Sequence, residues 1–147
     1  MQTIWITGGS SGIGFATAKE FLKNDWQVII SSSSQEKLSN AKTRLNEINK
    51  KNLLHIIKCD ISIKKEVDET VENIEKNIGK IDIALLNASA YSPNKDQTFN
   101  ISNYELLIDV NIKGTLYCIN KLKDFMKFRD NTIAIISSPL GYRGWPT

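Results

Sequence analysis

Five short apolar runs, separated by stretches with helical spacing, constrain the fold of this sequence more than any other feature. The runs are nearly continuous in Ile, Val and Leu and lie at residues 2–7, 26–31, 53–59, 81–87 and 132–137. Strands that are covered by helices on both faces have this composition, whereas half-exposed strands alternate apolar with polar residues. The repeated strand–helix order therefore predicts a doubly wound parallel sheet in a three-layer α/β/α sandwich.

The stretches between the runs predict four helices. Apolar residues recur at helical spacing in segments near 12–24, 35–49, 67–78 and 102–128. Gly79 is expected to end the third helix. One apolar face of the fourth helix is expected to carry Ile108, Ile112, Leu116, Ile119, Leu122 and Met126. We expect loops around Pro93 and Asn94 and over the tail after the fifth strand.

Composition and charge exclude several classes of protein. The chain has 147 residues, of which 41% are hydrophobic and 24% charged, which predicts one globular domain spanning residues 1–147. No run approaches the ~18 apolar residues of a membrane-spanning helix. The N-terminal MQTIWITGG lacks the regions of a signal peptide, and the net charge of +3 is too small to indicate nucleic-acid binding. We therefore expect a cytoplasmic protein that binds neither membrane nor nucleic acid.

The cysteines and the single histidine do not indicate a metal site. Cys59 and Cys118 lie far apart in apolar segments, which predicts free buried thiols in a reducing compartment. His55 has no Cys or His near it in the sequence, so a packed or surface histidine is favoured over a ligand.

A glycine-rich turn, TGGSSGIG at residues 7–14, follows the first predicted strand and opens the first predicted helix. Such a turn lets the backbone approach a pyrophosphate closely, and the helix N-terminus offers N–H groups to the anion. Gly8 would allow the tight turn, Gly12 the close approach, and Gly14 the packing of helix on sheet. A tight turn without a ligand is the alternative. The candidate cofactor-binding residues here are Gly8, Ser10, Ser11, Gly12, Ile13 and Gly14.

The G-x-x-x-G-x-G spacing of this turn resembles that of the short-chain dehydrogenase/reductase family. The resemblance implies a Rossmann-type sheet with strand order 3-2-1-4-5 and right-handed crossovers. It also implies NAD(P)-dependent hydride transfer between the nicotinamide and a small-molecule carbonyl or secondary alcohol. Members of the family commonly pair through the long fourth helix, so we expect a homo-oligomer.

Two further segments match the family's cofactor-binding motifs. In CDIS, residues 59–62, the resemblance implies that Asp60 accepts a hydrogen bond from the adenine amino group and that Ile61 lies beside the ring. A turn or cap role is the alternative for Asp60. LNAS at 86–89 resembles the family's N-N-A-G, with Asn87 and Ala88 matching and Ser89 in place of Gly. Asn87 would steady the central sheet, and the segment would pass the cofactor ribose.

Two residues match catalytic positions of the family. In V-N-x-x-G, Asn111 would lie at a kink of the long helix and bind a water of the proton relay. Ser138, in IISS at 135–138, would hydrogen-bond the substrate oxygen. A plain helix residue and a strand-end turn serine are the respective alternatives.

The catalytic Tyr-x-x-x-Lys of the family is missing from this chain. Only nine residues follow Ser138, and position 146, four residues after Tyr142, is Pro rather than Lys. A general acid contributes about 10²–10⁴-fold to catalysis. We therefore expect the N-terminal portion of an oxidoreductase that is inactive as a fragment, with a non-catalytic dinucleotide-binding protein as the alternative.

The end of the second predicted strand bears on the choice of dinucleotide. An acidic residue there would bind the 2′-hydroxyl of NAD. This chain instead has a run of serines in which Ser32 and Ser33 are candidate cofactor contacts, and serine hydroxyls can donate to phosphate oxygens. We therefore favour NADP over NAD.

Overall fold

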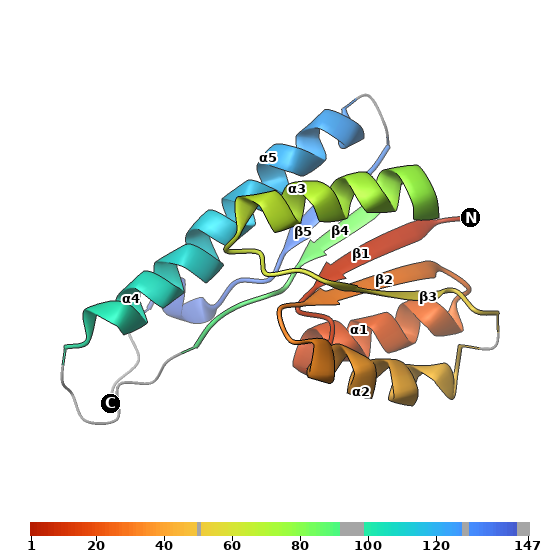
Figure 1. The fold of residues 1–147 in the computed structure, drawn as a ribbon, viewed down its shortest axis with the longest axis horizontal. Helices are drawn as coiled ribbons and strands as arrows, with labels where there is room; N and C mark the ends of the chain where they lie inside the picture. The colour runs from red at the N-terminus through yellow and green to blue at the C-terminus, as the bar shows by residue number, and fades with distance from the viewer. Residues whose placement is uncertain (50, 92–98, 128–129, 144–147) are drawn as a thin grey trace.

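Five parallel strands form the central sheet of the protein, in a computed structural model that describes residues 1–49, 51–91, 99–127 and 130–143. The strands run in the order β3-β2-β1-β4-β5, as the resemblance implied (Figure 1). Each begins and ends within two residues of its predicted bounds. These bounds are β1 Thr3–Thr7, β2 Gln27–Ser32, β3 Leu54–Lys58, β4 Ile83–Leu86 and β5 Thr132–Ile135.

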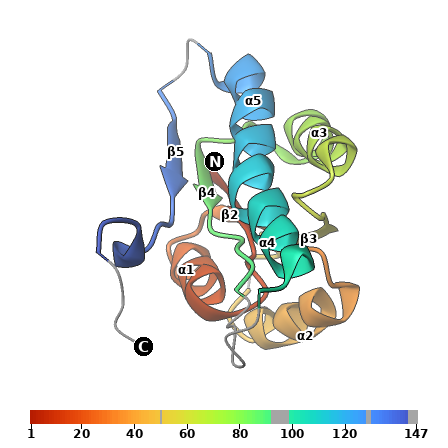
Figure 2. The ribbon, with the colours of Figure 1, turned by 90° about the vertical axis from the view of Figure 1, so that its left-hand side faces the viewer.

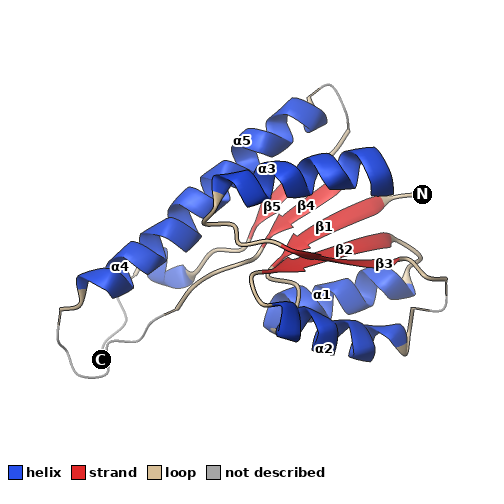
Figure 3. Cartoon of the chain, in the orientation of Figure 1, coloured by secondary structure: helices blue, strands red, loops and turns tan. Residues whose placement is uncertain are grey.

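Helices cover both faces of the sheet (Figure 3). On one face lie α1 (Gly12–Lys23) and α2 (Gln35–Asn46). On the other lie α3 (Lys64–Asn73) and a long helical column made of α4 (Ile101–Leu107) and α5 (Thr115–Met126). This confirms the three-layer sandwich. The expected loop at Pro93 and Asn94 lies outside the described residues.

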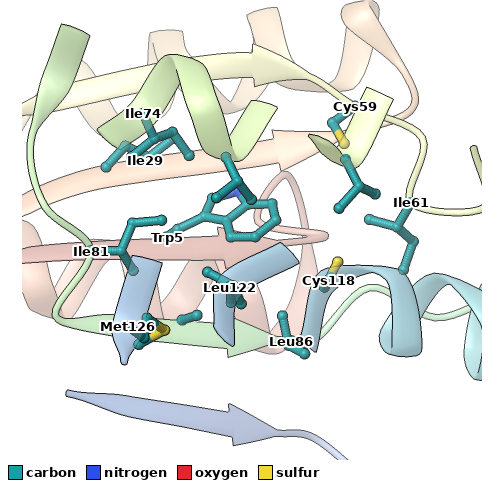
Figure 4. Packing of buried hydrophobic residues seen from close by; sticks show 13 residues of the cluster. Trp5, Ile29, Cys59, Ile61, Ile74, Ile81, Leu86, Cys118, Leu122 and Met126 are labelled. Atoms are coloured by element: carbon teal, nitrogen blue, oxygen red, sulfur yellow. The ribbon is translucent and has the colours of Figure 1, made fainter. Parts of the chain in front are cut away.

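Each central strand contributes side chains to two separate apolar cores. Ile4 and Ile6 of β1 pack with α1 and α2, whereas Trp5 between them packs with α3 and α5. Trp5 lies in the middle of its core (Figure 4) and is fully buried. Because successive side chains of a strand point to opposite faces, a strand buried on both faces must be apolar at every position. This is why the strands read as continuous rather than alternating apolar runs.

The third helix ends directly before Gly79, as the sequence predicted. After α3 the chain makes a π-helical turn, Ile74–Ile78, and Gly79 follows. The Gly79 N–H donates to the Ile74 carbonyl at 2.9 Å, which is the i→i−5 bond of a π turn. Gly79 also lies close to Thr3 and Gln27, because a Cβ built on it would come within 3.1 Å of both side chains.

The long fourth helix differs from its prediction in the middle. A π-helical segment, Ile108–Gly114, joins α4 to α5, and the α-helical part ends at Met126 rather than 128, which lies outside the described residues. The predicted apolar face is therefore only partly covered. Leu122 is buried, but Ile108, Ile112 and Leu116 are 45%, 54% and 57% exposed. The π segment adds residues to the turn and shifts the face, and α4 projects past the end of the sheet (Figure 1).

The fifth strand lies at one edge of the sheet (Figure 2). Its two ends, Thr132 and Ile135, are exposed, whereas the two residues between them are half-buried. The tail was expected to be loop throughout, but Pro139–Gly141 forms one 3₁₀ turn that the Gly141 N–H closes onto the Ser138 carbonyl. Proline at the first position of a short helical turn costs no hydrogen bond.

Candidate functional site

A cavity of about 800 Å³ opens where the strands end. Its walls come from the ends of the five strands and the segments that follow them. The π-helical segment Ile108–Gly114 and the start of α5 complete the wall. In a parallel sheet with this strand order, the connections leave in opposite directions from β1 and β4, and a crevice forms between them. The volume is in the range of small-molecule and cofactor sites.

The structure brings nearly all of the predicted site residues to this one cavity. Gly14 is the exception. The lining residues that the sequence predicted are Gly8, Ser10, Ser11, Gly12, Ile13, Ser32, Ser33, Asp60, Ile61, Asn87, Ala88, Ser89, Asn111 and Ser138.

The glycine turn leaves open space at one specific position. Gly8 and Gly12 both have positive φ, at 64° and 55°. A Cβ on Gly12 would meet nothing within 4 Å, so the turn is bare on the side that faces the cavity. Ser11 is the N-cap residue of α1 but makes no side-chain cap bond to it. The first turn of α1 therefore lacks a side-chain cap from this residue, and helix N-termini of this kind accept anions.

Gly14 packs the first helix against the sheet. A Cβ there would come within 2.6 Å of the Asn87 Nδ2 and 2.7 Å of the Gly8 carbonyl. This agrees with the packing role that the sequence predicted for Gly14. A side chain at this position would therefore collide with the protein itself rather than enter the cavity.

Asn87 ties the end of β4 to the end of β1. Its Nδ2 donates to the Thr7 carbonyl at 3.1 Å and to the Gly8 carbonyl at 3.2 Å. The Thr7 hydroxyl in turn accepts from the backbone N–H groups of Asn87 and Ala88, each at 3.0 Å. These bonds hold the glycine turn and the segment after β4 against each other at the floor of the cavity.

Asn111 lies in the π-helical segment Ile108–Gly114, where the resemblance implied a kink. Its side chain binds the backbone of Ala90 at both groups: Oδ1 accepts from the Ala90 N–H at 2.8 Å, and Nδ2 donates to the Ala90 carbonyl at 3.0 Å. The Thr115 hydroxyl donates to the Asn111 carbonyl at 3.0 Å. Asn111 therefore holds the loop after β4, a contact that the sequence did not reveal.

Asp60 forms a turn and lines the cavity as well. Its Oδ1 accepts from the backbone N–H of Ser62 at 3.0 Å and from the Ser62 hydroxyl at 2.7 Å. The Asp60 N–H donates to Glu66 Oε2 at 2.8 Å. The turn role that was the alternative for Asp60 is thus present, and it leaves the side chain at the wall of the cavity.

The four serines at the end of β2 and directly after it, residues 31–34, divide into two groups. Ser31 is buried and its hydroxyl accepts from the Trp5 indole N–H at 3.1 Å, and Ser34 caps α2 by accepting from the Lys37 N–H at 3.3 Å. Ser32 and Ser33, the two candidate cofactor contacts, line the cavity. Lys37 lines it too, and the sequence reasoning missed it. Its place in the first turn of the helix after β2 was the available signal.

No tyrosine of the described chain lines the cavity. Tyr91 is 84% exposed and Tyr142 is 96% exposed, and neither belongs to the wall. At the end of β5, Ser137 and Ser138 supply hydroxyls. Among the described residues, the charged groups of the wall are Lys37 and Asp60. The wall therefore offers hydrogen-bonding groups rather than an acid that is tuned to donate a proton near neutral pH.

The cysteines are free and buried, as predicted. Burial raises the pKa of Cys59 to about 11 and that of Cys118 to about 12. Both thiols are protonated near neutral pH, and the thiolate is the reactive form. Although Cys59 belongs to the cavity wall, it is therefore unsuited to act as a nucleophile. Within the part of the chain that the structure describes, no cluster of three or more metal-ligating side chains occurs.

His55 lies on β3 and takes part in a polar chain across three strands. Its Nε2 is 3.1 Å from the Gln27 Nε2, and the Gln27 Oε1 accepts from the Thr3 hydroxyl at 3.2 Å. Because the amide nitrogen of Gln27 is a donor, His55 Nε2 acts as the acceptor and the ring is neutral. Burial, with a smaller contribution from Lys42, lowers the pKa of His55.

Proteins that are similar in sequence to this chain are longer than it. A family model described as short chain dehydrogenase matches residues 2–147. An uncharacterized oxidoreductase of Staphylococcus haemolyticus is 34% identical over 117 residues, which are 80% of this chain and 49% of that protein. A second one, from Staphylococcus aureus, is 32% identical over 114 residues, 78% of this chain and 48% of that protein. The chain thus spans about half the length of these curated relatives.

Solved structures of the same fold cover almost the whole chain. A short chain dehydrogenase from Bacillus anthracis has a TM-score of 0.86 at 26% identity, with 99% of this chain and 58% of that chain covered. RhlG of Pseudomonas aeruginosa, solved in an active-site complex with NADP, has a TM-score of 0.86 at 21% identity over the same shares. These likenesses show the fold, and the match of the family model over residues 2–147 establishes that the chain belongs to the short chain dehydrogenase family.

Proposed function

We propose that this chain binds a nicotinamide dinucleotide in the cavity at the strand ends, as the cofactor-binding domain, residues 1–147, of an NAD(P)-dependent oxidoreductase. The observation that carries the proposal is the convergence of the family's motif residues on one cavity: Gly12, Ser33, Asp60, Asn87 and Ser138 come from segments after five different strands. The reaction would be hydride transfer between the nicotinamide and a carbonyl or secondary alcohol. The nicotinamide supplies the hydride when it is bound.

Different lining residues of the cavity would contact different parts of such a ligand. The bare turn at Gly12 and the uncapped start of α1 suit the pyrophosphate. Asp60 and Ile61 would contact the adenine, and the segment from Asn87 to Ser89 would pass the nicotinamide ribose. Ser138, at the end of β5, would hold the substrate oxygen. Ser32 and Ser33 favour NADP over NAD, because their hydroxyls can donate to a 2′-phosphate.

Residues 1–147 on their own would bind the cofactor without turnover. The wall has no tyrosine among the described residues, and both side-chain groups of Asn111 are used by Ala90. A serine hydroxyl does not supply a proton near neutral pH, so the developing alkoxide would lack its acid. A non-catalytic dinucleotide-binding protein is the second candidate, and the same missing tyrosine favours it.

The coding sequence after codon 147 separates the two candidates. A Tyr-x-x-x-Lys segment encoded shortly after that codon, in any frame, supports the oxidoreductase and excludes the non-catalytic protein. Adding that segment to residues 1–147 should then create activity toward ketones, aldehydes or quinones. Turnover by residues 1–147 alone at ~1–10³ s⁻¹, abolished in Ser138→Ala, would contradict the proposed lack of an acid.

Substitution of Gly12 tests the binding site itself. Gly12→Asp places a carboxylate in the open space next to the proposed pyrophosphate, and Gly12→Asn places a neutral group of the same shape there. Both residues tolerate positive φ better than other side chains. We expect wild-type protein to bind NADPH or NADH, Gly12→Asn to bind more weakly, and Gly12→Asp to lose binding. Nicotinamide fluorescence titration measures this. Equal affinity in all three folded proteins would place the dinucleotide elsewhere.

We also propose that the protein is a cytoplasmic homo-oligomer. Exposed apolar side chains gather along the α4–α5 column, at Ile101, Ile108, Ile112 and Leu116. Within the described residues, no helix is long and apolar enough to cross a membrane. Two free buried thiols suit a reducing compartment.

A further inference from the structure

We propose that Gly114 is a positioning residue of the cavity, because its lack of a side chain sets the place of Ile61, the proposed adenine contact. The inference rests on the proposed binding of a dinucleotide and adds how the adenine end of the site keeps its shape. Gly114 is the last residue of the π-helical segment. Ile61 lies in the segment after β3 and lines the cavity.

The backbone at Gly114 does not itself require glycine. Its φ of −58° and ψ of −45° are ordinary helical values that any residue adopts. Alanine would be the more stable choice for this conformation, because glycine destabilises a helix interior relative to alanine. Gly114 is buried. A need for space, rather than for backbone freedom, therefore explains the glycine.

Ile61 fills the space beside Gly114. A Cβ built on Gly114 would come within 2.8 Å of both Cδ1 and Cγ1 of Ile61, and within 3.0 Å of the Ile61 carbonyl oxygen. The side chain of Ile61 points toward the helix that carries Cys118 (Figure 4). Only 5% of Ile61 is exposed, so it packs against the helical column while it borders the cavity.

The backbone around Ile61 is held in place. Asp60, the preceding residue, accepts at Oδ1 from the Ser62 N–H at 3.0 Å, so a hydrogen-bonded turn spans Ile61. The Asp60 N–H donates to Glu66 Oε2 of α3 at 2.8 Å. The backbone of Ile61 therefore has little freedom to move away from Gly114, and its side chain is the part that gives way.

The helical column is held near Gly114 as well. Three residues before it, Asn111 bonds to both backbone groups of Ala90, at 2.8 Å and 3.0 Å. Directly after it, the Thr115 hydroxyl donates to the Asn111 carbonyl at 3.0 Å. A methyl group on Gly114 would therefore displace the side chain of Ile61, and the open space that Ile61 borders is the cavity. The displaced side chain would enter the space proposed for the adenine.

This displacement weakens ligand binding without unfolding the protein. In the protein without ligand, the side chain of Ile61 can turn into the cavity and relieve the overlap with the added methyl group. A bound adenine forces the side chain back and restores the overlap. The cost of overpacking then falls on the bound state and lowers the affinity by about tenfold. A glycine with a merely structural role would lose stability and leave the affinity of the folded protein unchanged.

A pair of compensating substitutions tests the assignment. Gly114→Ala adds one methyl group, and Ile61→Val removes Cδ1, one of the two atoms nearest to it. Gly141→Ala is the control, because a Cβ there would meet no described residue within 4 Å and Gly141 does not line the cavity. Calorimetry measures the affinity for NADPH, NADH and adenosine 5′-monophosphate, and urea unfolding measures the stability of each variant.

We expect Gly114→Ala to bind all three ligands about tenfold more weakly than the wild type. Its free energy of unfolding should stay close to the wild-type value. Adding Gly114→Ala to Ile61→Val should cost little affinity, because the space of Cδ1 receives the new methyl group. Gly141→Ala should bind as the wild type does, and nicotinamide mononucleotide, which lacks the adenine, should bind equally to all variants.

Binding of NADPH or NADH that Gly114→Ala does not weaken would overturn the inference and leave the proposed function standing. The same holds for a loss of affinity that is equally large in the wild-type and Ile61→Val backgrounds, because it would not act through Ile61. A Gly114→Ala protein that fails to fold would also overturn the inference, since the proposed displacement leaves stability intact. A folded wild-type protein that binds neither dinucleotide would overturn both.

Discussion

His55 is the only histidine of the chain, and its neutral ring is part of the polar chain from Thr3 through Gln27 across the sheet. Because its pKa is lowered in the folded protein, the unfolded chain binds a proton at higher pH than the folded chain does. Stability from this group is therefore complete above the ordinary histidine pKa of about 6.5 and is lost as pH falls through the lower folded value. We predict that the free energy of unfolding falls between about pH 7.5 and pH 5.5.

Urea unfolding at the two pH values measures this, and His55→Gln is the comparison. Gln keeps a hydrogen-bonding side chain opposite Gln27 but does not titrate, so its stability should change less over the same range. A wild-type protein that is equally or more stable at the lower pH would contradict the assignment of a neutral His55.

Individual residues show where sequence reasoning stops. The glycine turn was predictable, because its spacing and its place between strand and helix reflect local backbone requirements. The place of Lys37 in the cavity wall was not predicted, because many helices carry a lysine in the first turn and only the fold brings this one to the cavity. The bond from Asn111 to Ala90 joins residues 21 apart in sequence, so no local pattern indicates it.

The π-helical segment Ile108–Gly114 positions one part of the cavity wall. It carries Asn111, whose two hydrogen bonds hold Ala90, and both residues line the cavity. We predict that Asn111→Ala frees the loop after β4 locally, so the Ala90 amide exchanges with solvent about tenfold or more faster, as expected for the loss of a bond worth roughly 1.5 kcal/mol.

Hydrogen exchange with mass spectrometry or NMR measures this local effect. Thr115→Val, which removes the hydroxyl bond to the Asn111 carbonyl but keeps the side-chain shape, should leave Ala90 protected. Unchanged exchange at Ala90 in folded Asn111→Ala would show that other contacts order the loop.

The strands and the order of elements were predictable because the strand segments are nearly continuous apolar runs and the apolar residues between them recur at helical spacing. The π segments were not, since the apolar residues Ile108, Ile112 and Leu116 keep a spacing that an ordinary α-helix also has. Periodicity identifies an apolar face but not what covers it. The first half of the predicted face is consequently exposed, whereas Leu122 and Met126 are buried.

The whole molecule presents apolar surface that its own residues leave uncovered. Leu116 lies in the exposed part of the α4–α5 column, and β5 is an edge strand whose Ile135 is exposed. Contiguous exposed apolar patches commonly mark protein interfaces, and open strand edges pair with other chains. We predict self-association that depends on concentration, measured by sedimentation velocity.

Leu116→Lys should shift this equilibrium toward monomer by placing a charge in the patch. Ile63→Lys is the matched control, because Ile63 is an exposed isoleucine at the start of α3, outside the column. A wild-type protein that stays monomeric at high concentration would contradict the proposed homo-oligomer.

Binding of the dinucleotide at the strand ends is tested most directly by NMR. Isotope-labelled protein is titrated with NADPH and with NADH, and the backbone amide shifts are followed. The proposed site predicts that shifts gather at residues 8–12, 32–33, 60–61 and 87–90, while amides at the opposite end of the sheet, such as those of Gln27 and Leu54, stay in place. A folded spectrum that neither dinucleotide changes, or shifts that gather away from the cavity, would contradict it.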